Sequence, residues 1–151
     1  MIVVDASVAL KWFVPEPGSE QAERLLEFDL PRAAPAHVLV EVGQALLRHH
    51  RSGGLTADHC RLVMSKIRDV VRLFPTEMLA DAAFQIAAEA SCSMYDALYV
   101  AAAERWDCWL VTADAKLRTQ LLGSLWQHAV WLLGADTDER RLMDTPSRAA
   151  R

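Results

Sequence analysis

Short runs of β-branched and other apolar residues alternate with longer segments of helical periodicity along this chain. We expect strands at residues 2–4, 32–34, 70–74, 108–112 and 129–133, and helices at residues 7–13, 16–28, 36–51, 56–71, 76–90, 93–106 and 115–122. Strands that alternate with helices form a sheet covered on both faces. The pattern therefore predicts an α/β fold with a central, mostly parallel sheet of four to five strands.

The length of 151 residues suffices for one packed core and favours a single domain. We expect this domain to span residues 1–133. The sequence of residues 134–151 is polar and aperiodic, which is typical of a mobile C-terminal tail. The start of the chain lacks the pattern of a secretory signal, and no apolar run reaches the roughly 20 residues that cross a bilayer. We therefore expect a cytoplasmic location.

The net charge and the types of metal-binding residue limit the kinds of site that this chain can contain. The formal net charge of −4 argues against binding nucleic acid by bulk electrostatics, but it is compatible with an enzyme that holds divalent cations. The three cysteines show no C-x-x-C spacing, and the five histidines form no H-E-x-x-H pattern. A disulfide framework and a zinc site are both disfavoured.

Two aspartates, Asp5 and Asp114, each follow an expected strand and precede an expected helix. Ligands of open α/β sheets gather at the carboxyl ends of the strands, which favours a functional role. An ordinary helix N-cap explains each residue equally well. For either residue alone, both interpretations stay open.

Glu41 and Asp96 lie on helices with strongly apolar surroundings. Glu41 falls on or beside the buried face of its helix, where an unpaired carboxylate costs several kcal/mol. Pairing with Arg48 is the alternative to a functional role. Asp96 opens a helix that is apolar nearly all round, and Ser93 with Asp96 resembles a capping box. Four carboxylates that converge in one pocket would repel each other, and divalent cations are the usual remedy.

The order and spacing of these motifs resemble those of PIN-domain ribonucleases, most closely the VapC-type toxins of bacterial toxin–antitoxin pairs. The matching stretches are Val4 to Val8, Pro35 to Ala45, Tyr95 to Ala103 and Leu110 to Leu117. The similarity extends to about Leu133. It implies a PIN-like three-layer α/β/α fold and an endoribonuclease that depends on Mg²⁺ or Mn²⁺.

The resemblance also implies roles for individual residues. The residues in the places of the family's acidic quartet, as catalytic groups and metal ligands, are Asp5, Glu41, Asp96 and Asp114. Asp5 and Asp96 would be the principal ligands, and the other two would be ligands or position water. Ser7 and Thr112 match hydroxyl positions that orient these acids or their waters, although ordinary helix-start and strand-end hydroxyls explain them as well.

The implied partners are an RNA substrate, an antitoxin protein and a second copy of the chain. We expect the homodimer to form through helices near the N-terminal half. Arg48 and Arg51 could hold the RNA backbone. A solvated basic helix end, which suits the helix dipole, is the alternative for these arginines.

Two other classes of protein compete with the nuclease. A receiver-type phosphoacceptor domain also gathers acids at strand ends around Mg²⁺, but it would need an acid pair after the first strand, where Ala6 follows Asp5. A PIN-like module that binds RNA or protein without cutting is the closer alternative. The complete set of four acids favours the nuclease.

Overall fold

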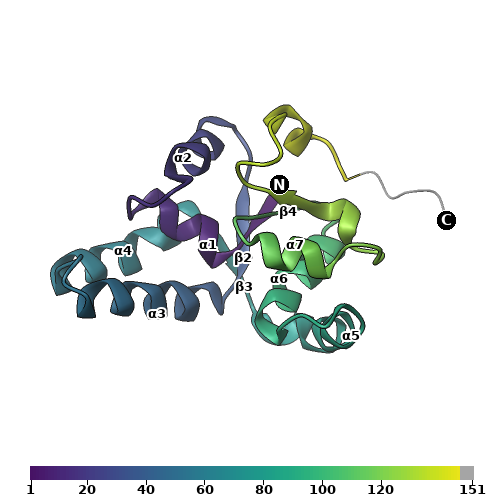
Figure 1. The fold of residues 1–151 in the computed structure, drawn as a ribbon, viewed down its shortest axis with the longest axis horizontal. Helices are drawn as coiled ribbons and strands as arrows, with labels where there is room; N and C mark the ends of the chain where they lie inside the picture. Colours follow the sequence, from purple (N-terminus) through teal and green to yellow (C-terminus); the bar gives the residue numbers. More distant parts are fainter. Residues whose placement is uncertain (147–151) are drawn as a thin grey trace.

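A five-stranded parallel sheet forms the centre of the computed structural model, which describes residues 1–146 (Figure 1). Its strands are β1 (Ile2–Val4), β2 (Arg32–Pro35), β3 (Arg72–Phe74), β4 (Trp109–Thr112) and β5 (Val130–Leu132). They lie in the order β3-β2-β1-β4-β5, and every neighbouring pair is parallel. The expected α/β fold is confirmed, and the sheet is parallel throughout.

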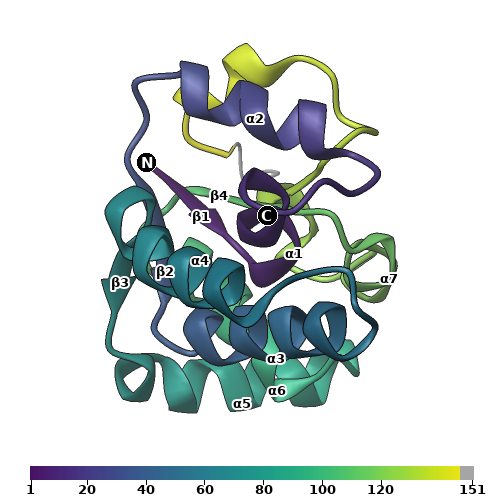
Figure 2. The same ribbon diagram turned by 90° about the vertical axis from the view of Figure 1, so that its left-hand side faces the viewer.

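Helices cover both faces of this sheet and complete a three-layer arrangement (Figures 1 and 2). One face carries α1 (Ala6–Ala9), α2 (Ser19–Glu27), α3 (Val38–Arg51) and α4 (Ala57–Val70), and the other carries α5 (Ala80–Ala90), α6 (Met94–Arg105) and α7 (Ala115–Gln120). Right-handed crossovers produce this division, because the chain runs in one direction from β1 to β3 and in the opposite direction from β3 to β5. Within residues 1–146, no helix has the length and apolar character needed to cross a membrane.

The strand order reverses between β1 and β4, the two central neighbours. The segments that follow these strands leave toward opposite faces of the sheet, so a crevice opens at their carboxyl ends. Asp5 comes directly after β1, and Asp114 comes two residues after β4. The topology therefore places both aspartates at the switch point of the sheet.

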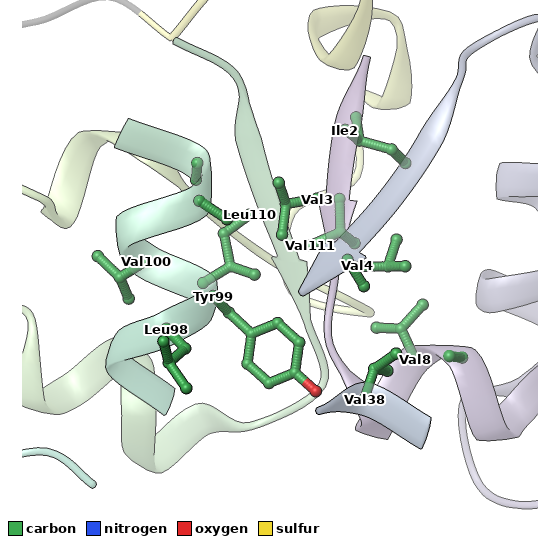
Figure 3. Packing of buried hydrophobic residues seen from close by; sticks show 14 of the residues in the cluster. Ile2, Val3, Val4, Val8, Val38, Leu98, Tyr99, Val100, Leu110 and Val111 are labelled. Atoms are coloured by element: carbon green, nitrogen blue, oxygen red, sulfur yellow. The ribbon is translucent and has the colours of Figure 1, made fainter. Parts of the chain in front are cut away.

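The core surrounds β1 and β4, which are buried along their whole length. In α6, the seven consecutive residues from Ala97 to Ala103 are all buried. A helix that is apolar nearly all round has to be enclosed, and α6 accordingly packs against β1, β2 and β4. Figure 3 shows the Tyr99 side chain on the side of this helix that faces the sheet, and Val100 on the opposite side.

The ends of several helices differ from the expected boundaries. The expected helix 7–13 is one α-helical turn followed by the 3-10 turn η1 (Leu10–Trp12), and the expected helix 76–90 begins as the 3-10 turn η2 (Thr76–Leu79). The end of α3 follows the Gly53-Gly54 signal. Gly53 has a φ of +78°, and the amides of Gly53 and Gly54 donate to the carbonyls of His50 and His49.

Part of the described chain after β5 packs against the sheet. The 3-10 turn η3 (Gln127–Ala129) leads into β5, and the 3-10 turn η4 (Glu139–Met143) follows it, with Leu142 buried. The Trp109 indole nitrogen donates to the carbonyls of Arg141 at 3.0 Å and Asp144 at 2.9 Å. These contacts differ from the mobile tail expected for residues 134–151. The division at residue 133 stays a prediction, and residues 147–151 lie outside the described residues.

A small ion-pair network joins the loop after η1 to the end of α3. Glu16 accepts a hydrogen bond from Lys11 Nζ at 3.0 Å, and its other oxygen lies 3.0 Å from His49 Nε2. Burial raises the pKa of Glu16, but the hydrogen bonds and charges of Lys11 and His49 outweigh burial and leave this pKa below its ordinary value. Ionised Glu16 therefore stabilises the folded chain.

We expect Glu16→Gln to lower the free energy of unfolding at pH 7 by about 0.2–1 kcal/mol, the range of partly exposed ion pairs. A carboxyl whose pKa is lower in the folded state contributes stability above its unfolded pKa and loses it as the pH falls through the folded pKa. The difference between the native chain and the variant should therefore shrink as the pH falls below the ordinary pKa of a glutamate, about 4.3. Urea unfolding between pH 7 and pH 3 measures this, with the exposed Glu23→Gln as a control for the loss of one charge. A constant difference across that range would contradict the role of the ionised carboxylate.

Candidate active site

Asp5 is a buried carboxylate, with 6% of the residue exposed. Its Oδ1 accepts hydrogen bonds from Ser7 Oγ at 2.6 Å and from the Val8 amide at 3.0 Å, and its Oδ2 accepts from Thr112 Oγ1 at 2.5 Å. Asp5 thus caps α1, as the N-cap alternative predicts. Burial raises the pKa of Asp5 above its ordinary value. The three hydrogen bonds lower this pKa but offset burial only in part, and the charge of Asp114 raises it further.

Two hydroxyl groups tie the ends of β1 and β4 together. The fully buried Thr112 donates to Asp5 and accepts a hydrogen bond from the Asp114 amide at 2.9 Å. Ser7 Oγ, which donates to Asp5, accepts from the Ala113 amide at 2.9 Å. Both hydroxyls therefore orient Asp5 and fix the backbone that leads to Asp114.

Asp114 follows β4 and caps α7. Its Oδ1 accepts hydrogen bonds from the amides of Lys116 at 2.7 Å and Leu117 at 3.2 Å. One oxygen therefore satisfies the helix N-terminus, and neither amide bonds the other oxygen, Oδ2. Capping and ligand binding are compatible on this carboxylate.

Glu41 lies in the first turn of α3 and is partly buried. Its Oε2 accepts a hydrogen bond from the Tyr99 hydroxyl at 2.5 Å and lies 3.5 Å from His37 Nε2. Arg48, the alternative partner, lies two turns further along the same helix, so the partner is Tyr99. Burial raises the pKa of Glu41, and the Tyr99 hydrogen bond opposes this shift while the charges of Asp5 and Asp96 reinforce it.

Asp96 stands at the start of α6. Its amide donates to Ser93 Oγ at 3.1 Å, and Ser93 Oγ donates to Asp96 Oδ2 at 2.7 Å. Ser93 is the N-cap of α6, so the expected capping arrangement is present. The side chain of Asp96 is half-exposed and close enough to Glu41 for their charges to interact.

The four predicted acids come from four elements of the fold, and their charges are linked in pairs. The charge of Asp114 raises the pKa of Asp5, and the charges of Asp5 and Asp96 both raise the pKa of Glu41. In the described part of the chain, no three acidic, histidine or cysteine side chains already lie close enough to hold a metal ion. The residues present still fit a hard divalent cation, because they offer carboxylate oxygens whose mutual repulsion a cation would relieve.

The predicted RNA-binding arginines do not join this group of acids. Arg48 and Arg51 are exposed near the C-terminal end of α3, about 10 and 15 Å along the helix axis from Glu41. Their basic side chains also suit the C-terminal end of the helix dipole. Contact with RNA stays a prediction for both residues.

Two residues beside Glu41 were missed by the sequence analysis. Tyr99 follows Asp96 by three positions on α6, and His37 precedes Glu41 by four positions. Burial lowers the pKa of His37, so its imidazole is neutral near pH 7. The signal in the sequence was a tyrosine hydroxyl within a run of apolar helix residues, one turn from a predicted site acid.

Comparison with known proteins identifies the family. The PIN domain family matches residues 2–120 of this chain. The Ribonuclease VapC3 of Pyrobaculum aerophilum is 33% identical over 123 residues, which cover 77% of this chain and 91% of the relative. The chain belongs to the PIN-domain family, among the VapC ribonucleases. The resemblance noted in the sequence is thereby confirmed.

Solved structures of VapC-like proteins share the fold. VapC20 of Mycobacterium tuberculosis, described as a toxin that cleaves the sarcin-ricin loop, superposes with a TM-score of 0.62 at 21% identity and covers 79% of this chain and 94% of its own. A chain from a toxin–antitoxin complex of Klebsiella pneumoniae gives a TM-score of 0.61 at 17% identity, with 87% and 96% covered. At these identities, the likeness establishes the PIN-like fold alone.

We expect Thr112→Val to lower the free energy of unfolding by about 1–3 kcal/mol. Valine keeps the shape of the side chain but removes the hydroxyl that serves Asp5 and the Asp114 amide, so a buried acceptor and a donor lose their partner. Chemical denaturation measures the change. Thr119→Val is the matched control, since its exposed hydroxyl bonds only the carbonyl of Ala115 within α7, and it should stay within about 0.5 kcal/mol of the native chain. Equal effects of the two substitutions would contradict the structural role of Thr112.

Proposed function

We propose that this chain is a cytoplasmic, Mg²⁺- or Mn²⁺-dependent endoribonuclease and the toxin of a type II toxin–antitoxin system. What supports the proposal is that Asp5 and Asp114 follow the two strands at the switch point of the sheet, and that the charges of Asp5 and Asp96 act on Glu41 while that of Asp114 acts on Asp5. The names of the relatives support RNA as the substrate, since VapC3 is called a ribonuclease and VapC20 a toxin that cleaves the sarcin-ricin loop.

The four acids would together bind the cation and position the reacting water. When bound, a divalent cation supplies a deprotonated water and neutralises the charge that develops on the phosphate. Asp5 and Asp96 are assigned as principal ligands, and Glu41 and Asp114 as ligands or acceptors for the water. Ser7 and Thr112 keep the Asp5 carboxylate in one orientation, so that it need not reorganise when the substrate arrives.

Cleavage of an RNA panel tests this proposal. The native chain should cut RNA with Mg²⁺ or Mn²⁺ and stop when EDTA removes the metal. Asp5→Asn and Asp96→Asn should each lower the rate by about 100-fold or more, because the cation's contribution is worth several kcal/mol. Asp81→Asn, on the exposed side of α5, is the control for the loss of one acid.

The outcomes separate the nuclease from its alternatives. Cleavage that is unaffected by Asp5→Asn and Asp96→Asn would come from a contaminant. A chain that binds Mn²⁺ but cuts no RNA would be a PIN-like binding module, which sinks the enzymatic proposal.

We further propose that the chain forms a homodimer and binds an antitoxin. Val40 and Leu47 are exposed by 70% and 45%, and they lie two turns apart on the same side of α3, with Gly43 and Gln44 between them. Two exposed apolar side chains on one side of a helix favour a contact with another protein surface. The toxin–antitoxin complex among the similar structures supports an antitoxin partner, with the neighbouring gene as its expected source.

Light scattering measures both associations. The native chain should show the mass of a dimer, and a Val40→Asp, Leu47→Asp double variant should show that of a monomer with unchanged circular dichroism. Leu125→Asp, which also replaces an exposed leucine, is the control and should stay dimeric. The product of the neighbouring gene should add its mass to the native chain and suppress cleavage. A native monomer at high concentration would contradict the homodimer.

A further inference from the structure

The side chain of Tyr99 reaches from the core into the group of acids. The residue lies on α6, one turn after Asp96, and only 1% of it is exposed. Figure 3 shows its ring extending from α6 past the ends of the strands, with the hydroxyl directed toward Val8 of α1 and Val38 of α3. The hydroxyl therefore ends where α1, α3 and α6 meet.

The contacts of this hydroxyl join the elements that carry three of the acids. It donates to Glu41 Oε2 at 2.5 Å, a short hydrogen bond of the kind formed with a charged acceptor. The amide of Ala6, next to Asp5, also approaches the oxygen, and the negative charges of Glu41 and Asp5 both act on it. One hydroxyl on the Asp96 helix thus holds Glu41 beside Asp5.

The environment of Tyr99 keeps the hydroxyl in the role of a donor. A tyrosine hydroxyl is protonated at neutral pH and can therefore donate a hydrogen bond, here to Glu41. The ring is held by the core, next to the His37 ring at a centroid distance of 4.5 Å. Because the Tyr99 side chain has so little freedom, it fixes the position of the Glu41 carboxylate that accepts its hydrogen bond. Without this bond, the partly exposed Glu41 side chain would sample several rotamers.

We propose that Tyr99 is a positioning residue that holds the Glu41 carboxylate in the acid cluster and thereby sets the affinity of this cluster for divalent cations. This inference rests on the proposed function, because it assigns Glu41 to cation binding. It differs from a purely structural role, in which the Tyr99 ring would fill the core and its hydroxyl would have no effect on cation binding.

Calorimetric titration with Mn²⁺, without RNA, tests the inference. Tyr99→Phe keeps the ring and removes only the hydroxyl, and it should weaken Mn²⁺ binding about 10-fold, as the loss of a residue that orients a metal ligand does. Tyr95→Phe is the matched control, since Tyr95 is an exposed tyrosine on the same helix, and it should bind Mn²⁺ as the native chain does.

A double-mutant cycle shows whether Tyr99 acts through Glu41. In a Glu41→Gln background, Tyr99→Phe should cause no further loss of Mn²⁺ affinity. Glu41→Asp provides a second route if Tyr99→Phe unfolds the chain. It keeps the charge but shortens the side chain away from the Tyr99 hydroxyl, and it should weaken binding by a similar factor.

The results distinguish a failure of the role of Tyr99 from a failure of the proposed function. Native affinity in Tyr99→Phe, beside a weakened Asp5→Asn, would overturn the role of Tyr99 and leave the proposed function in place. A further 10-fold loss in the Glu41→Gln background would also overturn it, because Tyr99 would then act on another group. A native chain that binds no Mn²⁺ would overturn the proposed function together with the inference.

Discussion

The hydrogen bond between Thr112 and Asp5 joins the two central strands at the point where the chain turns away from the sheet. A buried carboxylate is costly unless donors surround it, and here the donors come from both strand ends. The bond can form only when β1 and β4 are paired in register, Val4 beside Val111. The core that stabilises the fold therefore also sets the position of the first candidate site acid.

Three of the acids combine a structural task with the candidate chemistry. Asp5 and Asp114 accept hydrogen bonds from amides in the first turns of α1 and α7, and Asp96 is paired with Ser93 at the start of α6. Caps hold carboxylates in defined orientations, and helix N-termini favour negative charge. The cap and the functional role, between which the sequence leaves the choice open, are therefore compatible, because a carboxylate has two oxygens that can accept several contacts.

Glu41 shows how strongly the surroundings of an acid matter. It has no capping task, and its oxygen is bound by the hydroxyl of Tyr99, 58 positions away in the sequence. The apolar residues around this pair weaken the screening by water, so that the charges of Asp5 and Asp96 act on Glu41. The candidate site is consequently a property of packed helices as much as of the strand ends.

The sequence by itself determined the alternation of strands and helices, the positions of the acids at strand and helix ends, and the glycine end of α3. These features depend on local periodicity and capping, which a few neighbouring residues decide. Only the tertiary structure decided that Glu41 is bound by Tyr99 rather than by Arg48, and that Leu142 and the carbonyls of Arg141 and Asp144 pack onto the sheet. Such contacts join residues far apart in the chain, and they depend on strand order and helix packing, which no local pattern encodes.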